Sequence, residues 1–189
     1  MGGEFGQSSE WNFQQSLDLH LLQYDFHKGV QELVKDLNSL YRSYPALYEK
    51  QFSPEGFQWI DYGDAENSVL TSIRKGKHSR DDLIIACNFT PVPRENYRIG
   101  VPKSRQLKEL LNSDASRYGG SGGGGGDARV SKTPWHGYQH SIEVNLPPLG
   151  VVIWRYSQVS IVVVHNCTSG DFTFSPNCVS FVRLITFHL

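Results

Sequence analysis

HSIEVNL, at residues 140–146, alternates apolar and polar side chains along most of its length. Its apolar positions recur at every second residue, at Ile142, Val144 and Leu146. Successive side chains of a β-strand point to opposite faces, so this spacing predicts a strand with one buried and one solvent-facing side.

Six further stretches are rich in β-branched and aromatic residues and are separated by turn residues such as Gly63, Gly76 and Pro91. They are FQWID (57–61), NSVLTSIRK (67–75), DLIIACNFT (82–90), YRIGV (97–101), QLKELLN (106–112) and GVVIWRY (150–156). Because no helical pattern separates these strands, the sequence predicts a mainly β fold, an antiparallel β-sandwich over residues 51–155.

A helix is predicted before this sandwich, since apolar residues recur there at spacings of three and four. They are Val30, Leu33, Val34, Leu37, Leu40, Tyr41 and Tyr44. Asp25 is the expected N-cap, and Pro45 is expected to end the helix.

An unusual glycine-rich segment opens the chain, and several strings in it and beyond it resemble one family. The strings are GGEFGQ, EWN, HKGVQELVKDLNSLYRSYPAL, PEGFQWID, NFTPVPRENYRIGV, LLNSDASRYGGS and HSIEVNLPPLGVVIW. Together they resemble the C-terminal part of glycogen (1,4-α-glucan) branching enzymes, in the α-amylase superfamily, from Met1 to about Trp154. One departure is Leu19, where the family usually has tryptophan.

The resemblance implies a division of the chain into three parts. Residues 1–50 are expected to be the C-terminal remnant of a catalytic (β/α)8 barrel, namely a loop and the last barrel helix. Residues 51–155 are expected to be the α-amylase-type C-terminal all-β domain. Residues 156–189 match nothing in the family, so this tail is expected to be a frameshifted or disordered addition, or else a genuine extra hairpin.

The family forms α-1,6 branches by retaining glycosyl transfer, and the resemblance places its three catalytic carboxylates upstream of this chain. We therefore expect no catalytic residue here, and the chain alone is expected to be inactive. Glu4, Glu10 and Asp18 lie in the barrel remnant, but the resemblance assigns them no catalytic role. Trp11 and Asn12 are candidate substrate-binding residues, because an indole can stack on a glucose ring and a carboxamide can hydrogen-bond its hydroxyls. The alternative for Trp11 is that it fills the junction between barrel and helix.

Two other functions remain open from the sequence. A stand-alone glucan-binding sandwich would use exposed aromatic residues such as Trp59, Trp135 or Tyr138. Alternatively, the β domain serves only to cover and stabilise the barrel. An α-glucan is the expected partner both of a branching-enzyme fragment and of a glucan-binding sandwich. The parent enzyme is expected to be a monomer.

Composition excludes several other classes. The 189 residues carry a formal net charge of −1, which gives no electrostatic argument for binding nucleic acid or an anionic membrane. No apolar run reaches the ~20 residues that span a bilayer, and no signal peptide is recognisable. Cys87, Cys167 and Cys178 have no close pairing, so neither disulfides nor a metal site is expected, and no cofactor either. A cytoplasmic location is the simplest expectation.

His136 and His140 are expected to be surface residues rather than metal ligands, because they lie in a turn and a strand with no third ligand nearby. The run GGSGGGGG at residues 119–126 has the composition of a flexible linker. Predicted strands of the same domain follow it, however, so we expect a long surface loop within the β domain.

Overall fold

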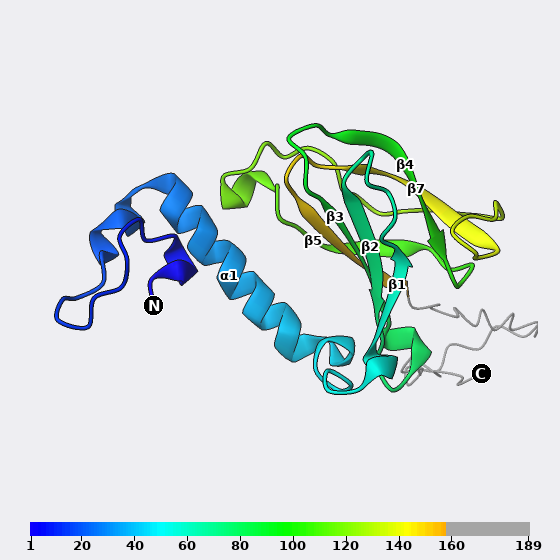
Figure 1. Ribbon diagram of the computed structural model, residues 1–189, viewed down its shortest axis with the longest axis horizontal. Helices are drawn as coiled ribbons and strands as arrows, with labels where there is room; N and C mark the ends of the chain where they lie inside the picture. Colours follow the sequence, from blue (N-terminus) through cyan, green and yellow to red (C-terminus); the bar gives the residue numbers. More distant parts are fainter. Residues whose placement is uncertain (158–189) are drawn as a thin grey trace, which may run out of the picture. The chain divides into compact units, whose positions relative to one another are not determined.

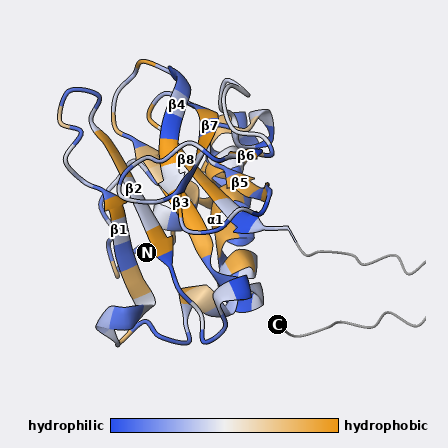
Figure 2. Ribbon diagram, turned by 90° about the vertical axis from the view of Figure 1, so that its right-hand side faces the viewer, coloured by the Kyte–Doolittle hydropathy of each residue, from blue (hydrophilic) through white to orange (hydrophobic). Residues whose placement is uncertain are grey.

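Eight strands form two antiparallel β-sheets in the computed structural model, which describes residues 1–157 (Figures 1 and 2). The larger sheet has the order β1-β2-β3-β8-β5, and the smaller has the order β4-β7-β6. The strands are β1 Phe57–Asp61, β2 Val69–Arg74, β3 Leu83–Asn88, β4 Arg94–Val101, β5 Leu107–Asn112, β6 Val130–Ser131, β7 His140–Leu146 and β8 Val151–Tyr156. The predicted antiparallel sandwich is confirmed, and only the two-residue β6 had not been anticipated.

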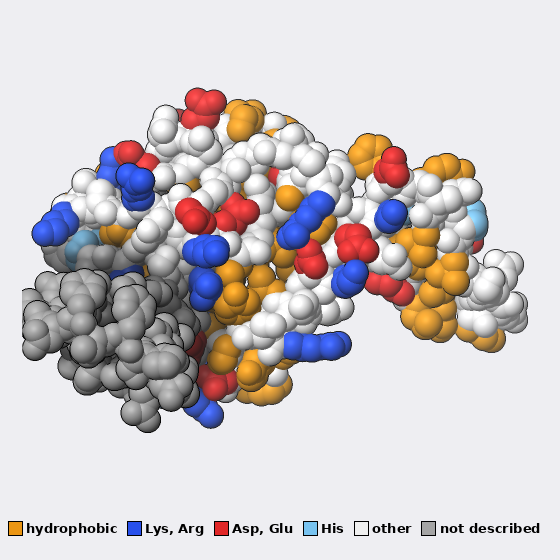
Figure 3. All heavy atoms as spheres, turned by 180° about the vertical axis from the view of Figure 1, so that it is seen from behind, with side chains coloured by type: hydrophobic (Ala, Val, Ile, Leu, Met, Phe, Trp, Pro, Cys, Tyr) orange, Lys and Arg blue, Asp and Glu red, His pale blue; other side chains and the backbone are white. Residues whose placement is uncertain are grey.

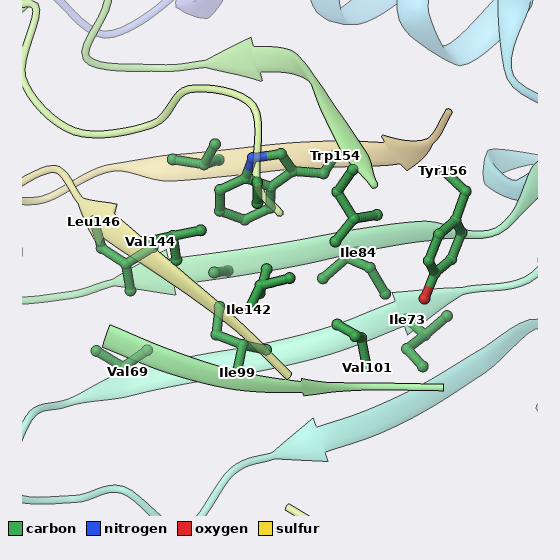
Figure 4. Close-up of a cluster of buried hydrophobic side chains, with 14 residues drawn as sticks. Val69, Ile73, Ile84, Ile99, Val101, Ile142, Val144, Leu146, Trp154 and Tyr156 are labelled. Atoms are coloured by element: carbon green, nitrogen blue, oxygen red, sulfur yellow. The ribbon is translucent and has the colours of Figure 1, made fainter. Parts of the chain in front are cut away.

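Residues from both sheets fill the space between them, as the close-up of the core shows (Figure 4). Ile84 of β3 lies opposite Ile73 of β2 on one side and Trp154 of β8 on the other. In the facing sheet, Ile99 of β4 pairs with Ile142 of β7. All five side chains are at most 1% exposed, so the alternating positions of the sequence are the ones that build the core.

The single α-helix of the described residues, α1, covers Asp25–Ser43. Its N-cap is Tyr24, so the prediction that Asp25 caps the helix was wrong by one residue. Asp25 instead lies in the first turn, where a carboxylate interacts favourably with the helix dipole. Pro45 does follow the helix end, and it opens the 3-10 helix η3. The 3-10 helices are η1 Gly3–Phe5, η2 Leu19–Gln23, η3 Pro45–Leu47, η4 Pro54–Gly56, η5 Ser79–Asp81 and η6 Ser116–Tyr118.

Helix α1 packs on the outer face of the larger sheet. Leu40 is buried there in a second apolar cluster with Leu111 of β5 and Ile153 of β8, and Leu33 packs against the same cluster. The β domain thus covers part of the apolar face of α1. Leu37 and other apolar residues of the helix remain exposed.

Gly29 and Tyr118 hold α1 against the loop that carries η6. A Cβ added to Gly29 would lie 2.3 Å from the Tyr118 carbonyl oxygen, so only glycine permits this approach. The Tyr118 hydroxyl also donates a hydrogen bond of 2.6 Å to Asp36 of the helix. Burial, assisted by this bond to a carboxylate, raises the pKa of Tyr118 to about 12.

The glycine-rich loop lies within the β domain, as expected, since β6, β7 and β8 follow it. Its backbone is anchored at several points. Asp114 accepts hydrogen bonds from the N–H groups of Ser121 and Gly123, and Gly125 N donates to Asn145 O at 2.7 Å. Near its end, the buried indole of Trp154 donates to Gly126 O at 2.8 Å.

Among residues 1–157, no helix is long and apolar enough to cross a membrane. Cys87 is half-buried in β3, and burial raises the pKa of its thiol. The expected tail, apart from Tyr156 at the end of β8 and Ser157, lies outside residues 1–157, and so do Cys167 and Cys178. The boundaries proposed for the three parts of the chain stay predictions.

Candidate functional site

A polar hollow lies at one end of the sandwich, where the end of β1 and the β1–β2 loop approach the start of β4. Its volume is about 620 Å³. Asp61 and Asp64 line it from the β1 side, Asn96 and Arg98 from β4, and Trp135 from the connection between β6 and β7. Three segments that are distant in the sequence thus meet at one place.

A two-residue turn presents Trp135 at the rim. Trp135 and Tyr138 exchange both backbone hydrogen bonds, at 3.0 and 2.9 Å. His136 and Gly137 between them have φ values of 48° and 78°, the left-handed pair of a type I′ turn. The turn rests on Gly100 of β4, because a Cβ there would lie 2.2 Å from the Trp135 carbonyl oxygen. The backbone of Trp135 is therefore held in place at the rim.

His136 faces Asp61 inside the hollow, and its side chain is 17% exposed. Its Nδ1 accepts a hydrogen bond from Gly100 N at 3.4 Å, which leaves the proton of the neutral ring on Nε2. Nε2 lies 3.5 Å from an oxygen of Asp61. Burial lowers the pKa of His136, although Asp61 and Asp64 oppose the shift, so the ring is neutral at pH 7. His136 is half-buried, and the prediction of a surface residue was thus only partly correct.

Asp64 is the most fully hydrogen-bonded carboxylate of the hollow. It accepts from the Tyr97 hydroxyl at 2.7 Å and from the side-chain and backbone nitrogens of Asn67 at 2.9–3.1 Å. Burial acts to raise its pKa, but these bonds and the charge of Arg94 outweigh it and hold the pKa of Asp64 below its ordinary value. Burial and the neighbouring carboxylate strongly raise the pKa of Tyr97. Asp64 therefore serves the architecture of the hollow.

The basic side chains of the hollow are also engaged. Arg98 donates to Ser141 Oγ at 3.2 Å and forms an ion pair with Glu143. Arg94 donates to Asn67 O at 3.1 Å, and its buried Nε has no partner among residues 1–157. In this part of the chain no group of three or more His, Cys, Asp and Glu side chains could hold a metal ion. The arrangement is suited to hydrogen-bonding a neutral ligand, with one aromatic surface for stacking.

The predicted site residues Trp11 and Asn12 lie elsewhere, in the N-terminal loop. Trp11 is 50% exposed, and the Asn12 side chain accepts a hydrogen bond from Gln14 N. Glu4 accepts one from Gly2 N, and Asp18 accepts one from Ser9 Oγ, so both acids are tied into local structure. Apolar side chains crowd this N-terminal end (right in Figure 3), and the exposed ones include Trp11, Phe13, Leu19 and Phe26.

Two of the three aromatic residues expected to be exposed are so. Trp59 is 44% and Trp135 is 47% exposed. Tyr138 is instead half-buried against the core, and its hydroxyl accepts a hydrogen bond from Gln58 at 2.8 Å, so that prediction was wrong. Three aromatic residues, Phe57, Trp59 and Tyr62, form a row that follows β1 and continues just past its end. The ring centroid of Trp59 lies 4.7 Å from that of Phe57 and 6.1 Å from that of Tyr62.

The hollow is not foreshadowed by any motif in the sequence. Asp61 ends a predicted strand, and nothing in the spacing of the residues connects it with His136. The one local signal was His136-Gly137, because glycine at the second position suits a type I′ turn. Asparagine or aspartate is the more usual first residue of such a turn, so the signal was weak.

Comparison with known proteins gives one family and a consistent set of relatives. The family of the α-amylase C-terminal all-beta domain matches residues 59–157. The 1,4-alpha-glucan branching enzyme GlgB of Aquifex aeolicus is 51% identical over 157 residues, which are 82% of this chain and 25% of that protein. The enzyme of the same name from Pseudomonas fluorescens is 55% identical over 156 residues, covering 82% of this chain and 21% of the relative.

Among solved structures, a debranching enzyme from Nostoc punctiforme matches with a TM-score of 0.51 and 14% identity. The match covers 82% of this chain and 26% of that one, and it supports the fold alone. The chain thus spans about a fifth to a quarter of the length of the curated relatives it matches.

Proposed function

Because this chain belongs to the family of the α-amylase C-terminal all-beta domain, we propose that it forms the C-terminal portion of a 1,4-α-glucan branching enzyme. The observation that carries the proposal is the 51% identity to a branching enzyme over 157 residues. This aligned length is greater than the family match at residues 59–157, so the similarity extends beyond the all-β domain. An all-β domain shared only in general form with amylases would not give such an extension.

The activity of the whole enzyme is the transfer of a glucan segment from an α-1,4 bond to a 6-hydroxyl with retention of configuration. That chemistry uses a nucleophilic and an acid/base carboxylate about 5 Å apart. The acids of the N-terminal segment do not offer such a pair ready for use, since Glu4 and Asp18 are held by local hydrogen bonds. We propose that residues 1–157 support a catalytic barrel and do not catalyse branching themselves.

Within that enzyme, Trp11 and Asn12 are proposed to contact the glucan. Trp11 is half exposed and projects from a loop, so its ring is available for stacking without rearrangement of the core. The proposal also includes a cytoplasmic location and a monomeric parent enzyme, both of which rest on family resemblance.

The test is a chimera of the Aquifex aeolicus enzyme in which the 157 aligned residues are replaced by those of this chain. Branching is measured by the loss of iodine colour of amylose and by the appearance of α-1,6 anomeric signals in NMR spectra. We expect the chimera to branch amylose and this chain alone to leave it unchanged. A chimera that folds but gives no α-1,6 signal would contradict the proposal, as would branching by the isolated chain.

A second candidate function is glucan binding by the β domain, and the row of Phe57, Trp59 and Tyr62 favours it. Exposed aromatic rings in contact with one another on an edge strand are an extended apolar surface of the kind that recognises ligands. Co-sedimentation of the chain with glycogen tests this function, with Trp59→Ala as the variant expected to lose binding. Phe52→Ala is the control, since Phe52 is 96% exposed and does not belong to the row. Equal sedimentation of all three proteins would exclude a role of the row.

A further inference from the structure

We propose that the hollow edged by Trp135 is a separate binding site for a chain of α-1,4-linked glucose. The choice of glucan as ligand rests on the branching-enzyme assignment above. The site itself is argued from its charge, its unoccupied polar groups and its aromatic wall.

The charges of the hollow are nearly balanced. Asp61, Asp64 and Glu95 contribute carboxylates, and Arg94 and Arg98 contribute guanidinium groups. The carboxylates would repel a phosphate or a nucleic acid. Among the described residues, no group of His, Cys, Asp and Glu side chains could hold a metal ion. A neutral ligand with hydroxyl groups fits this wall better, because it carries no charge that either the carboxylates or the guanidinium groups would repel.

Some polar groups of the wall serve the fold, and others are left for a ligand. Asp64 and Arg98 are engaged by the protein, as described above. The Asn96 carboxamide is exposed and has no hydrogen-bond partner within residues 1–157, although its backbone is fixed at φ 51° and Asn96 N donates to Asn145 Oδ1. A carboxamide can give and accept hydrogen bonds at once, as sugar hydroxyls require.

Trp135 supplies the stacking surface. Its ring is 47% exposed, and the Arg98 guanidinium carbon lies 6.0 Å from the ring centroid. The turn that carries Trp135 is held by its two hydrogen bonds to Tyr138 and by the contact with Gly100. Because this backbone is held before binding, it loses little freedom when a ligand stacks on the ring.

The size of the hollow agrees with this reading. A volume of about 620 Å³ lies within the roughly 300–1,000 Å³ typical of small-ligand sites. Asp61 of the hollow directly precedes Tyr62 of the aromatic row in the sequence, so binding at the two places has to be distinguished through the separate signals of Trp135 and Trp59.

The experiment is a titration of the full 189-residue chain with maltoheptaose, followed through the indole N–H signals in ¹H–¹⁵N NMR spectra. Each of the four tryptophan signals is assigned by its single Trp→Phe variant. Two variants test the site: Trp135→Ala removes the stacking surface, and Asn96→Gly removes the carboxamide while permitting the positive φ. Phe52→Ala is the matched control for loss of an exposed aromatic ring, and cellohexaose is the control for linkage.

We expect the Trp135 signal to shift saturably with maltoheptaose and not with cellohexaose. Trp135→Ala and Asn96→Gly should each weaken binding at the hollow, measured on its remaining signals, with about a tenfold loss for the tryptophan, as is typical when an aromatic anchor is removed. If the Trp135 signal does not shift while that of Trp59 or Trp11 does, this inference is overturned and glucan binding elsewhere on the chain stands. If no signal shifts, the inference is likewise overturned, and the branching-enzyme assignment is still judged by the chimera.

Discussion

Replacement of Trp154 by phenylalanine tests how the core and the glycine-rich loop depend on one another. Trp154 is fully buried in the centre of β8, and its indole nitrogen holds the Gly126 carbonyl at 2.8 Å. Phenylalanine keeps an aromatic ring in the core but removes this hydrogen bond and leaves a void where the second ring lay. The same substitution at Trp11, which is 50% exposed, removes neither a core contact nor a buried bond.

The expected loss can be estimated from two contributions. Complete truncation of a buried tryptophan to alanine costs about 3–5 kcal/mol, so the partial truncation to phenylalanine should cost about 1–2 kcal/mol. Loss of the hydrogen bond adds a cost of about 1 kcal/mol, the lower end of the range for a buried group that loses its partner. The lower value applies because Gly126 is exposed, so water can reach its carbonyl oxygen. The free energy of unfolding should thus fall by about 2–3 kcal/mol, and Tm by about 4–12 °C for a domain of this size.

Urea denaturation and thermal unfolding followed by circular dichroism would measure these changes for Trp154→Phe, Trp11→Phe and the unchanged chain. Backbone amide exchange at Gly125 and Gly126 would report the loop, and it should become faster only in Trp154→Phe. The opposite outcome is a change of less than about 0.5 kcal/mol, the size of an ordinary surface substitution. It would mean that Trp154 does not organise the core or hold the loop.

Substitutions at Tyr97, Gly29 and Trp11 test three other parts of the described structure. Tyr97→Phe should reduce the free energy of unfolding by about 1 kcal/mol at pH 7, because a hydrogen bond to the Asp64 carboxylate is lost. The pKa of Asp64 is lower in the folded state than its ordinary 3.8, so this contribution is present above that value and is lost as pH falls through the folded pKa. Urea titrations at pH 7 and pH 3 measure it, and a difference that grows on acidification would contradict the argument. Replacing glycine by alanine inside a helix normally increases the free energy of unfolding by about 1 kcal/mol. Gly29→Ala should nevertheless destabilise the chain, because its Cβ would clash with the Tyr118 carbonyl oxygen. Thermal unfolding decides the sign, and a rise in Tm would show that α1 is not held there. Trp11→Ala in the chimera should raise the KM for amylose several-fold with the Tm unchanged, whereas a fall in Tm with the KM unchanged would favour a role in packing.

The sequence indicated most of the sandwich because its strands carry their own burial pattern. Val69, Thr71 and Ile73 of β2 alternate with side chains on the other face, and all three are buried as that spacing requires. A strand as short as β6, two residues long, has no such period and could not be recognised. The helix was visible for the same reason as the strands, but its partner was not, because the contact of Gly29 with Tyr118 depends on a loop far along the chain.

The candidate sites likewise differ in whether local sequence or contacts between distant segments determine them. Residue type and family resemblance predict Trp11 and Asn12 as glucan contacts, and both residues are exposed in the structure. The hollow could not be predicted, because it forms where Asp61 faces His136 across the two sheets. Tyr138 was expected to be exposed as its neighbour Trp135 is, yet the turn between them directs the two rings to different surroundings, one against the core and one at the rim.

The assignment to a branching enzyme is tested most directly by the α-1,6 content of amylose treated with the Aquifex aeolicus chimera. Three proteins are compared: the chimera, the chimera with Trp154→Ala, and the relative cut off before its 157 aligned residues. We expect α-1,6 signals from the chimera, and few or none from the other two, because the barrel needs a folded C-terminal portion. A chimera with cooperative unfolding and no branching would contradict the assignment, and full branching by the shortened relative would show that this portion is dispensable.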